Sequence, residues 1–384
     1  MATRNEFLVL NWQCFRERKG PIKKVYHRAT GIGSMPHLSA DGAIKIIRKN
    51  LHHIPHWPQL PRRDPAEGLI LQYLTPLMDA GLVSLKPGLT RTPFFEEDNH
   101  RWDERVLRYY EMLVGIGEEQ LLGEESPFAF ARGAAEGFFR FLNEDWDLPR
   151  TGMVKGQLSS PVTVGLQVTD QGGSPAFYND QLRELLVKTL TFHARWQVKQ
   201  LSRFSRPVLL FIDDPGVYGY GTSGYVALGR EDIQGSLREV INGIKGDGGV
   251  AGIHCCAGAD WSLMLELPFD LISFDAYDYF PSLLVYAGEL SAYLDRGGGL
   301  AWGIVPTSEK IDGEDADSLY TNLQNKIEIL VSHGVDREKL QKQLLLTPSC
   351  GAGTLSEEQA ERVYRVLAQL EKMVMDDPSS LGNS

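Results

Sequence analysis

The sequence lacks any long apolar run and any excess of positive charge. No stretch of about 18 consecutive apolar residues occurs, so we expect no membrane-spanning helix and no membrane partner. Residues 1–24 contain neither a continuous apolar core nor a small-residue cleavage site, so they do not resemble a secretory signal, and we expect a cytoplasmic protein. The chain has 39 lysines and arginines against 50 aspartates and glutamates. This acidic balance argues against nucleic acid as the main partner.

Cysteine is also scarce, with four residues in a chain of 384. Three of the four, Cys255, Cys256 and Cys350, fall in two short motifs that contain glycine. A disulfide framework needs more cysteines in a smaller chain. The scarcity and the clustering therefore predict a reducing compartment and metal chemistry.

Short apolar runs alternate with amphipathic stretches along almost the whole chain. Such alternation is typical of a parallel α/β fold, and we expect a single (β/α)8 barrel whose active site lies at the C-terminal ends of the strands. The expected domains are a poorly ordered N-terminal tail (1–24), the barrel (25–376) and a C-terminal tail (377–384). The expected strands are 25–33, 154–158, 207–212, 250–253, 271–274, 300–305 and 344–347. The expected helices are 42–51, 94–111, 128–142, 179–202, 233–244, 283–296, 318–333 and 357–375.

One strand end carries a pair of metal-competent side chains. The apolar run at 250–253 leads into His254 and Cys256, which lie two positions apart and so point to the same side of an extended chain. Cys350 follows the last expected strand and would supply a third ligand, which leaves one position of a tetrahedral zinc ion open, as in catalytic sites. Asp275, after the next strand, could occupy that position. The alternative is a core histidine and buried cysteines, and Cys255, which points the other way, is expected in the core.

The charge of such a centre favours one class of substrate. Two thiolates against Zn²⁺ leave a neutral centre, which is a poor Lewis acid for carbonyl hydrolysis. It still lowers the pKa of a soft sulfur ligand and leaves the thiolate nucleophilic. The sequence therefore predicts alkyl transfer onto a small thiol.

Two further strand ends offer polar groups to a substrate. Asp213 and Asp214 follow the apolar strand 207–212, and an ionised carboxylate at the mouth would bind an amino group. The alternative for Asp213 is a helix cap or a turn residue before Pro215. The glycine-rich residues 31–34 could offer backbone N–H groups to a carboxylate.

At these residues the sequence resembles the catalytic C-terminal barrel of cobalamin-independent methionine synthase, within the superfamily that also holds uroporphyrinogen decarboxylase. The resemblance covers residues 25 to about 375. The matching motifs occur in family order: Ile-Gly-Ser-Met-Pro at 32–36, Ser-Pro-Val-Thr at 160–163, Ile-Asp-Asp-Pro at 212–215, His-Cys-Cys at 254–256, Ile-Ser-Phe-Asp at 272–275 and Thr-Pro-Ser-Cys-Gly at 347–351.

The resemblance implies a role for each matching position. His254, Cys256 and Cys350 would ligate zinc, and Asp275 stands where the family has a glutamate ligand. Asp213 would hold the amino group of homocysteine and take part in catalysis. Asp214, where the family usually has glutamate, would also face the substrate. The backbone of Ile32, Gly33 and Ser34 would hold the substrate carboxylate.

The chain also departs from the family pattern. A family histidine is missing after the strand 300–305, where residues 306–309 read Pro-Thr-Ser-Glu, and the family's N-terminal barrel is absent. Single-barrel relatives are similar to methylcorrinoid-dependent methyltransferases, so the expected methyl donor is a methylcorrinoid protein or a methyl-folate. The expected product is methionine. The alternatives are a metal-free decarboxylase-like barrel and a zinc- and thiol-binding homologue without turnover.

Overall fold

The computed structural model describes residues 26–86, 92–222 and 228–377. The expected N-terminal tail, residues 1–24, and almost all of the expected C-terminal tail lie outside these ranges. None of the helices in the described part of the chain has the length and apolarity that a bilayer crossing requires.

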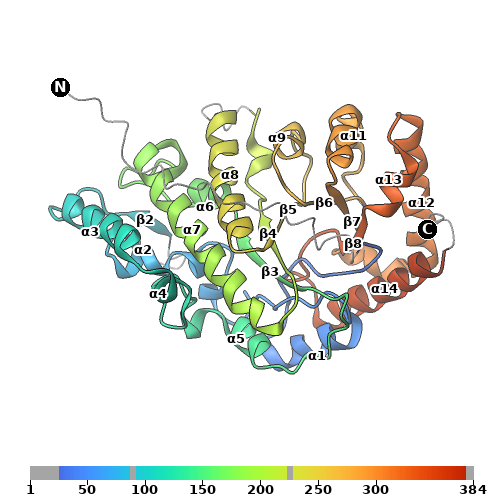
Figure 1. Ribbon diagram of the computed structural model, residues 1–384, viewed down its shortest axis with the longest axis horizontal. Helices are drawn as coiled ribbons and strands as arrows, with labels where there is room; N and C mark the ends of the chain where they lie inside the picture. The colour runs from blue at the N-terminus through green and yellow to red at the C-terminus, as the bar shows by residue number, and fades with distance from the viewer. Residues whose placement is uncertain (1–25, 87–91, 223–227, 378–384) are drawn as a thin grey trace.

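The chain is an α/β protein built on a curled parallel sheet of six strands (Figure 1). Each strand pairs in parallel with the next one along the chain, so the strand order in space is the order in sequence. The strands are β3 (Val154–Ser159), β4 (Val208–Asp213), β5 (Val250–Cys255), β6 (Leu271–Phe274), β7 (Gly299–Val305) and β8 (Leu344–Pro348).

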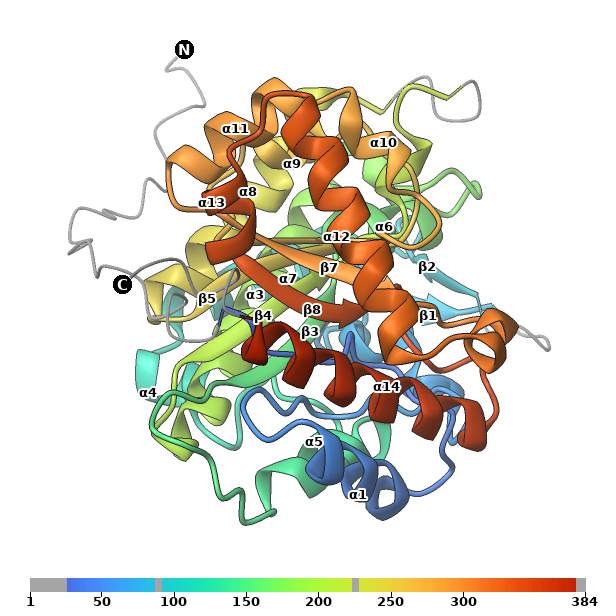
Figure 2. The ribbon, with the colours of Figure 1, turned by 90° about the vertical axis from the view of Figure 1, so that its right-hand side faces the viewer.

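Helices connect consecutive strands and cover the outside of the sheet (Figure 1). After β8, the last helix α14 packs against α1, as Figure 2 shows. The helices of this layer are α1 (Ala40–Asn50), α6 (Pro161–Gln167), α7 (Asp180–Leu201), α8 (Arg230–Gly246), α9 (Ser262–Leu265), α10 (Pro281–Leu284), α11 (Ala287–Asp295), α12 (Ala316–Ser332), α13 (Arg337–Lys342) and α14 (Glu357–Asp376).

An additional region lies between α1 and β3. It contains a two-stranded antiparallel sheet and several short helices. The elements are α2 (Thr75–Asp79), β1 (Val83–Leu85), β2 (Pro93–Phe95), α3 (Trp102–Gly115), α4 (Glu118–Leu122) and α5 (Glu136–Leu142).

The sheet is buried on both faces, and its two faces belong to different hydrophobic clusters. On β4 the residues Val208, Leu210 and Ile212 pack into the large cluster shared with the helices. The alternate residues Leu209 and Phe211 belong to a separate, smaller cluster on the inner face of the curl. Successive strand residues point to opposite faces, so this division is the one a sheet curled around its own core produces.

A ring of eight regular strands, as the expected barrel requires, is not present in the described residues, and the expected strand 25–33 is reduced there to an isolated bridge at Ala29. Between β8 and β3 the chain contributes only isolated parallel bridges, which join Ala29 to Leu346 and His56 to Lys155. A third bridge joins the two segments to each other, between Ser34 and Gln59. Glycines at 31 and 33 and prolines at 55 and 58 explain the shortness of these pairings, because glycine weakens strands and proline cannot donate to a ladder.

Candidate metal centre

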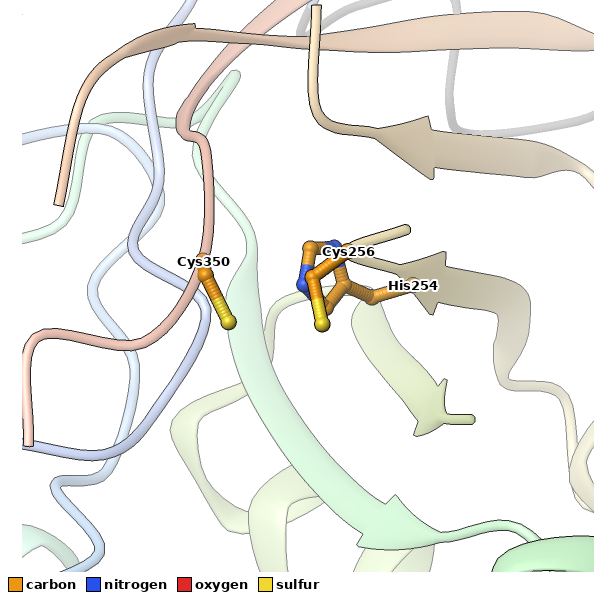
Figure 3. A group of neighbouring side chains, drawn as sticks. All are labelled: His254, Cys256 and Cys350. Atoms are coloured by element: carbon orange, nitrogen blue, oxygen red, sulfur yellow. The ribbon is translucent and has the colours of Figure 1, made fainter. Parts of the chain in front are cut away.

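Three side chains from two distant parts of the sequence meet at the C-terminal ends of the strands. His254 is in β5, Cys256 follows that strand, and Cys350 follows β8. One ligand atom from each lies within 4.8 Å of the other two. Figure 3 shows the three side chains converging from the end of β5 and from the loop after β8. The structure therefore brings together the three residues that the sequence singled out.

The imidazole of His254 contacts a hydroxyl group of the neighbouring strand. His254 Nδ1 lies 3.0 Å from the hydroxyl oxygen of Ser273, its register partner on β6. The other ring nitrogen, Nε2, is buried and has no hydrogen-bond partner. A neutral ring that donates from Nδ1 to Ser273 leaves the lone pair of Nε2 free, which is the arrangement that metal-ligating histidines adopt.

The thiols of Cys256 and Cys350 influence each other's pKa in opposite directions. A hydrogen bond from Cys350, together with the neighbouring His254, lowers the pKa of the Cys256 thiol to about 4. The same hydrogen bond, followed by burial, raises the pKa of Cys350 well above its usual range. Ligand atoms of a tetrahedral zinc ion lie roughly 3.8 Å apart, so small side-chain rotations would bring this group to bonding distance. One imidazole and two sulfurs are the soft donor set that zinc prefers.

The predicted fourth ligand, Asp275, does not belong to this group. Its carboxylate accepts a hydrogen bond from the backbone N–H of Asp278, at 2.8 Å. Burial raises the pKa of Asp275 to about 6. Within the described residues the group of three is therefore incomplete as a tetrahedron, and a ligand role for Asp275 stays a prediction.

Asp213 and Asp214 have different environments although they are adjacent in sequence. Asp213 is the register partner of His254, and its Oδ1 is buried without a hydrogen-bond partner. Burial raises the pKa of Asp213 to about 6, while the positive charge of Lys155 opposes the rise. An unpartnered carboxylate beside the candidate centre is available to a substrate cation.

Asp214 is occupied by the chain itself. Its carboxylate accepts hydrogen bonds from Ser160 Oγ at 2.7 Å and Thr163 Oγ1 at 2.8 Å. It also accepts from the backbone N–H groups of Gly216 at 3.2 Å and Val217 at 3.1 Å. Asp214, and not Asp213, therefore has the turn role that the sequence analysis gave as the alternative for Asp213. Both oxygens of Asp214 already accept hydrogen bonds from the chain, so the structure does not support its predicted role in substrate binding.

The segment 32–34 lies against the loop that carries Cys350. The backbone oxygen of Ser34 accepts a hydrogen bond from Ala352 N at 2.9 Å. A Cβ atom added at Gly351 would lie 2.0 Å from Ser34 Oγ. Glycine at 351 therefore leaves room for the hydroxyl of Ser34, which would have to move if position 351 carried a side chain.

Two residues of the site were not found from the sequence. Ser273, which orients His254, lies in an apolar strand and carries no signal of its own. Lys155 lies at the start of β3, and its position could have been found from the sequence. Lys155, Gln157 and Ser159 alternate with small or apolar residues, which places three polar side chains on one face of a buried strand.

Comparison with protein-family models and with curated proteins gives no match. Among solved structures, a B12-independent methionine synthase from Shewanella sp. W3-18-1, in complex with selenomethionine, is similar at 14% identity with a TM-score of 0.41. The likeness covers 59% of this chain and 63% of that chain, which is less than two thirds of the methionine synthase. The tandem catalytic modules of the pneumococcal exo-β-D-N-acetylglucosaminidase StrH are similar at 10% identity, with a TM-score of 0.42 and coverage of 91% and 86%. Both scores are too low to assign a family or an activity.

Proposed function

We propose that this chain is a zinc-dependent methyltransferase that transfers a methyl group to a small thiol, with homocysteine as the favoured acceptor and methionine as the product. The observation that carries the proposal is the meeting of His254, Cys256 and Cys350 around one point. Their donor set suits zinc, and it suits alkyl transfer to sulfur better than hydrolysis.

In this proposal the site lies at the mouth of one (β/α)8 barrel formed by residues 25–376, with 1–24 and 377–384 outside it. The isolated bridges support a closed ring, because they join β8 to the segment around residue 29 and join β3 to the segment around residue 56. Thr30 N donates to Leu346 O at 3.0 Å, and Lys155 N donates to Pro55 O at 2.9 Å. These two segments would occupy the places of the first and second strands.

The residues of the chain would bind and orient the acceptor. Zinc, when bound, lowers the pKa of a thiol that coordinates it, so that the sulfur is a nucleophile at neutral pH. Asp213 would hold the ammonium group of homocysteine, and the backbone of Ile32, Gly33 and Ser34 would hold its carboxylate. Asp275 is the candidate for the fourth ligand position before the thiol arrives.

Fixing the acceptor in this orientation raises the rate of methyl transfer. With both ends of the acceptor fixed, its sulfur faces the methyl donor, and the sulfur–carbon bond forms as the bond between the methyl group and the donor breaks. The donor is a methylcorrinoid protein or a methyl-folate, and the experiment must offer both.

The test is a product assay on the purified, zinc-loaded chain. Homocysteine is offered with methylcobalamin in one reaction and with methyltetrahydrofolate in another, and methionine is measured by mass spectrometry. The proposal expects methionine from at least one donor, its loss in Cys350→Ala, and its retention in Cys255→Ala. The Cys255 side chain is buried and outside the group of three, so it is the matched control.

One observation favours a second candidate, a zinc- and thiol-binding protein without turnover. In place of the missing family histidine, Thr307 N and Thr307 Oγ1 lie 3.2 Å and 3.1 Å from Ser349 Oγ. No imidazole is offered at this position. Thiol binding at the metal without methyl transfer from either donor would identify this candidate. The decarboxylase alternative, which depends on arginines around a tetrapyrrole, gains no such support, because no arginine is buried among the described residues.

A further inference from the structure

A lysine is completely buried on the inner face of the sheet, close to the residues proposed to bind the acceptor. Lys155 in β3 has no exposed surface. Its Nζ donates to the backbone oxygen of Ile32, lies 3.4 Å from Gln157 Oε1, and is 4.6 Å from the ring centre of Phe211. Burial lowers the pKa of Lys155 to about 8, and the charge of Asp213 opposes the lowering. A buried ammonium group is costly, so these partners must compensate for lost hydration.

The ammonium group links the two places that would hold the ends of an amino-acid substrate. Through its hydrogen bond to Ile32 O it holds the segment 32–34, the proposed carboxylate site. Through its charge it stabilises the carboxylate of Asp213, whose Oδ1 has no hydrogen-bond partner. Gln157 also holds this segment, because its side chain packs directly against Gly33. A Cβ atom added at Gly33 would lie 2.7 Å from Gln157 Cδ.

The same segment continues to the metal loop. Ser34 O accepts from Ala352 N, two residues after Cys350. The backbone of Lys155 also takes part, because Lys155 N donates to Pro55 O and Trp57 N donates to Lys155 O. One side chain and its backbone therefore connect β3 with both extended segments that lie between β3 and β8.

We propose that Lys155 is a positioning residue that makes the site selective for a thiol carrying both an ammonium and a carboxylate group. The inference rests on the proposed function. Lys155 does not touch the reacting sulfur. It holds the segment 32–34 in place for the substrate carboxylate. It also supplies the positive charge that compensates the buried carboxylate of Asp213.

The charges in the site agree with this role. A zinc ion with two thiolates and a neutral imidazole is neutral, and Lys155 and Asp213 cancel each other. A zwitterionic head group then enters without adding net charge to a buried site. Without Lys155, a buried negative charge would remain beside the substrate carboxylate, and the like charges would repel.

The experiment measures thiol binding to the cobalt(II)-loaded chain, because absorption by a thiolate bound to cobalt reports binding without turnover. The probes are homocysteine and 1-propanethiol, which share a thiol but differ in the head group. The variant is Lys155→Met, which keeps an unbranched side chain only one atom shorter and removes the charge. Lys245→Met is the control, since Lys245 in α8 forms an ion pair at 2.9 Å with Asp270, just before β6 and outside the candidate site.

The proposal expects Lys155→Met to weaken homocysteine binding by on the order of tenfold to a hundredfold, the effect of an unpaired buried charge. Binding of 1-propanethiol should stay within about twofold of wild type. Equal losses for both thiols would show a purely structural lysine, and unchanged homocysteine binding would show no role. Either result overturns the inference and leaves the proposed function in place.

Two further outcomes are distinguishable. A wild-type chain that binds neither thiol would overturn the proposed function, and the inference with it. If Lys155→Met does not fold, Lys155→Gln carries the same test, because it keeps an N–H donor on a side chain one atom shorter and removes the charge. It must then show the same selective loss for homocysteine.

Discussion

Single residues of the candidate centre owe their positions to the alternation of side chains along buried strands. His254 and Asp213 are register partners on adjacent strands, so they face the same interior. Cys255, between His254 and Cys256, is completely buried and lies outside the group of three. Burial raises the pKa of its thiol above the usual range, which keeps it protonated and poorly suited to a metal.

Gly351 offers a test at this scale, because the space beside it is filled by Ser34. A Cβ at position 351 would lie 2.0 Å from Ser34 Oγ and 3.3 Å from Ser34 Cβ, so in Gly351→Ala the Ser34 side chain must move and press on the segment 32–34 or the loop of Cys350. We expect zinc affinity to fall about tenfold or more, since displaced ligands lose coordination geometry. Competition with a chromophoric chelator measures the affinity.

Two companion variants make this test specific. Gly258→Ala places a Cβ at 3.4 Å from its nearest neighbour, an ordinary contact, and should bind zinc as wild type does. Ser34→Gly in the Gly351→Ala background removes the clash and should restore affinity. Unchanged zinc binding in Gly351→Ala alone would contradict the proposed tie between the two loops.

Elements with strong periodicity were predictable from the sequence, and those shaped by distant contacts were not. The apolar strand 207–212 and the capping-box helix 357–375 correspond closely to β4 and α14. The expected helix 128–142 is wrong for its first half, since α5 begins only at Glu136. Phe130 there packs edge-on against His193 and Trp196 of α7, contacts that a helical propensity cannot reveal.

The expected helix 94–111 failed for a related reason. Its first residues pair with β1 as the short strand β2, and α3 begins at Trp102.

The convergence of His254, Cys256 and Cys350 was predicted better than these elements, because the three residues stand at strand ends that topology alone brings together. Lys155 and Ser273 act through partners far away in sequence, so the sequence could not assign their roles.

Helix α14 carries a glutamate that makes stability depend on pH. Glu371 is buried against the segment around residue 28, and burial raises its pKa to about 7, while Arg28, 3.8 Å away, opposes the rise. His53 Nδ1 lies 3.6 Å from the same carboxylate, but burial lowers the pKa of His53 to about 4, so this ring is neutral above that pH.

The sign of the effect follows from the raised pKa. The folded chain binds this proton more tightly than the unfolded chain, whose glutamate titrates near 4.5. The resulting stability is complete below pH 4.5 and is lost as the pH rises through about 7. Glu371→Gln should remove this loss, which is on the order of 3 kcal/mol at most. Urea unfolding at pH 5 and pH 8 measures it, and an equal pH dependence in both proteins would contradict the assignment.

At the scale of the whole molecule, the candidate centre joins distant parts of the fold. His254 lies in β5, Cys256 directly follows it, and Cys350 lies in the loop after β8, with β6 and β7 between the two strands. A metal bound to all three would therefore restrain the curl of the sheet as well as form the site. Ligands that bind only the folded chain stabilise it by mass action.

Removal of zinc should accordingly lower the temperature of unfolding. Free zinc at 100 times its dissociation constant stabilises a folded chain by about 2.7 kcal/mol. We expect scanning calorimetry to show a lower transition after chelation, with recovery on adding zinc but not magnesium. Cys350→Ala should be insensitive to the chelator. The same transition in wild type with and without chelator would contradict a metal held between β5 and β8.

The central claim is that these three side chains bind one zinc ion, and elemental analysis of the purified chain tests it most directly. Wild type, Cys350→Ala and Cys255→Ala are compared after equilibration with zinc and removal of the unbound ion. The account predicts one zinc per chain in wild type and in Cys255→Ala, and a loss of most of the zinc in Cys350→Ala. Absence of zinc from the wild type, or a full complement in Cys350→Ala, would contradict it.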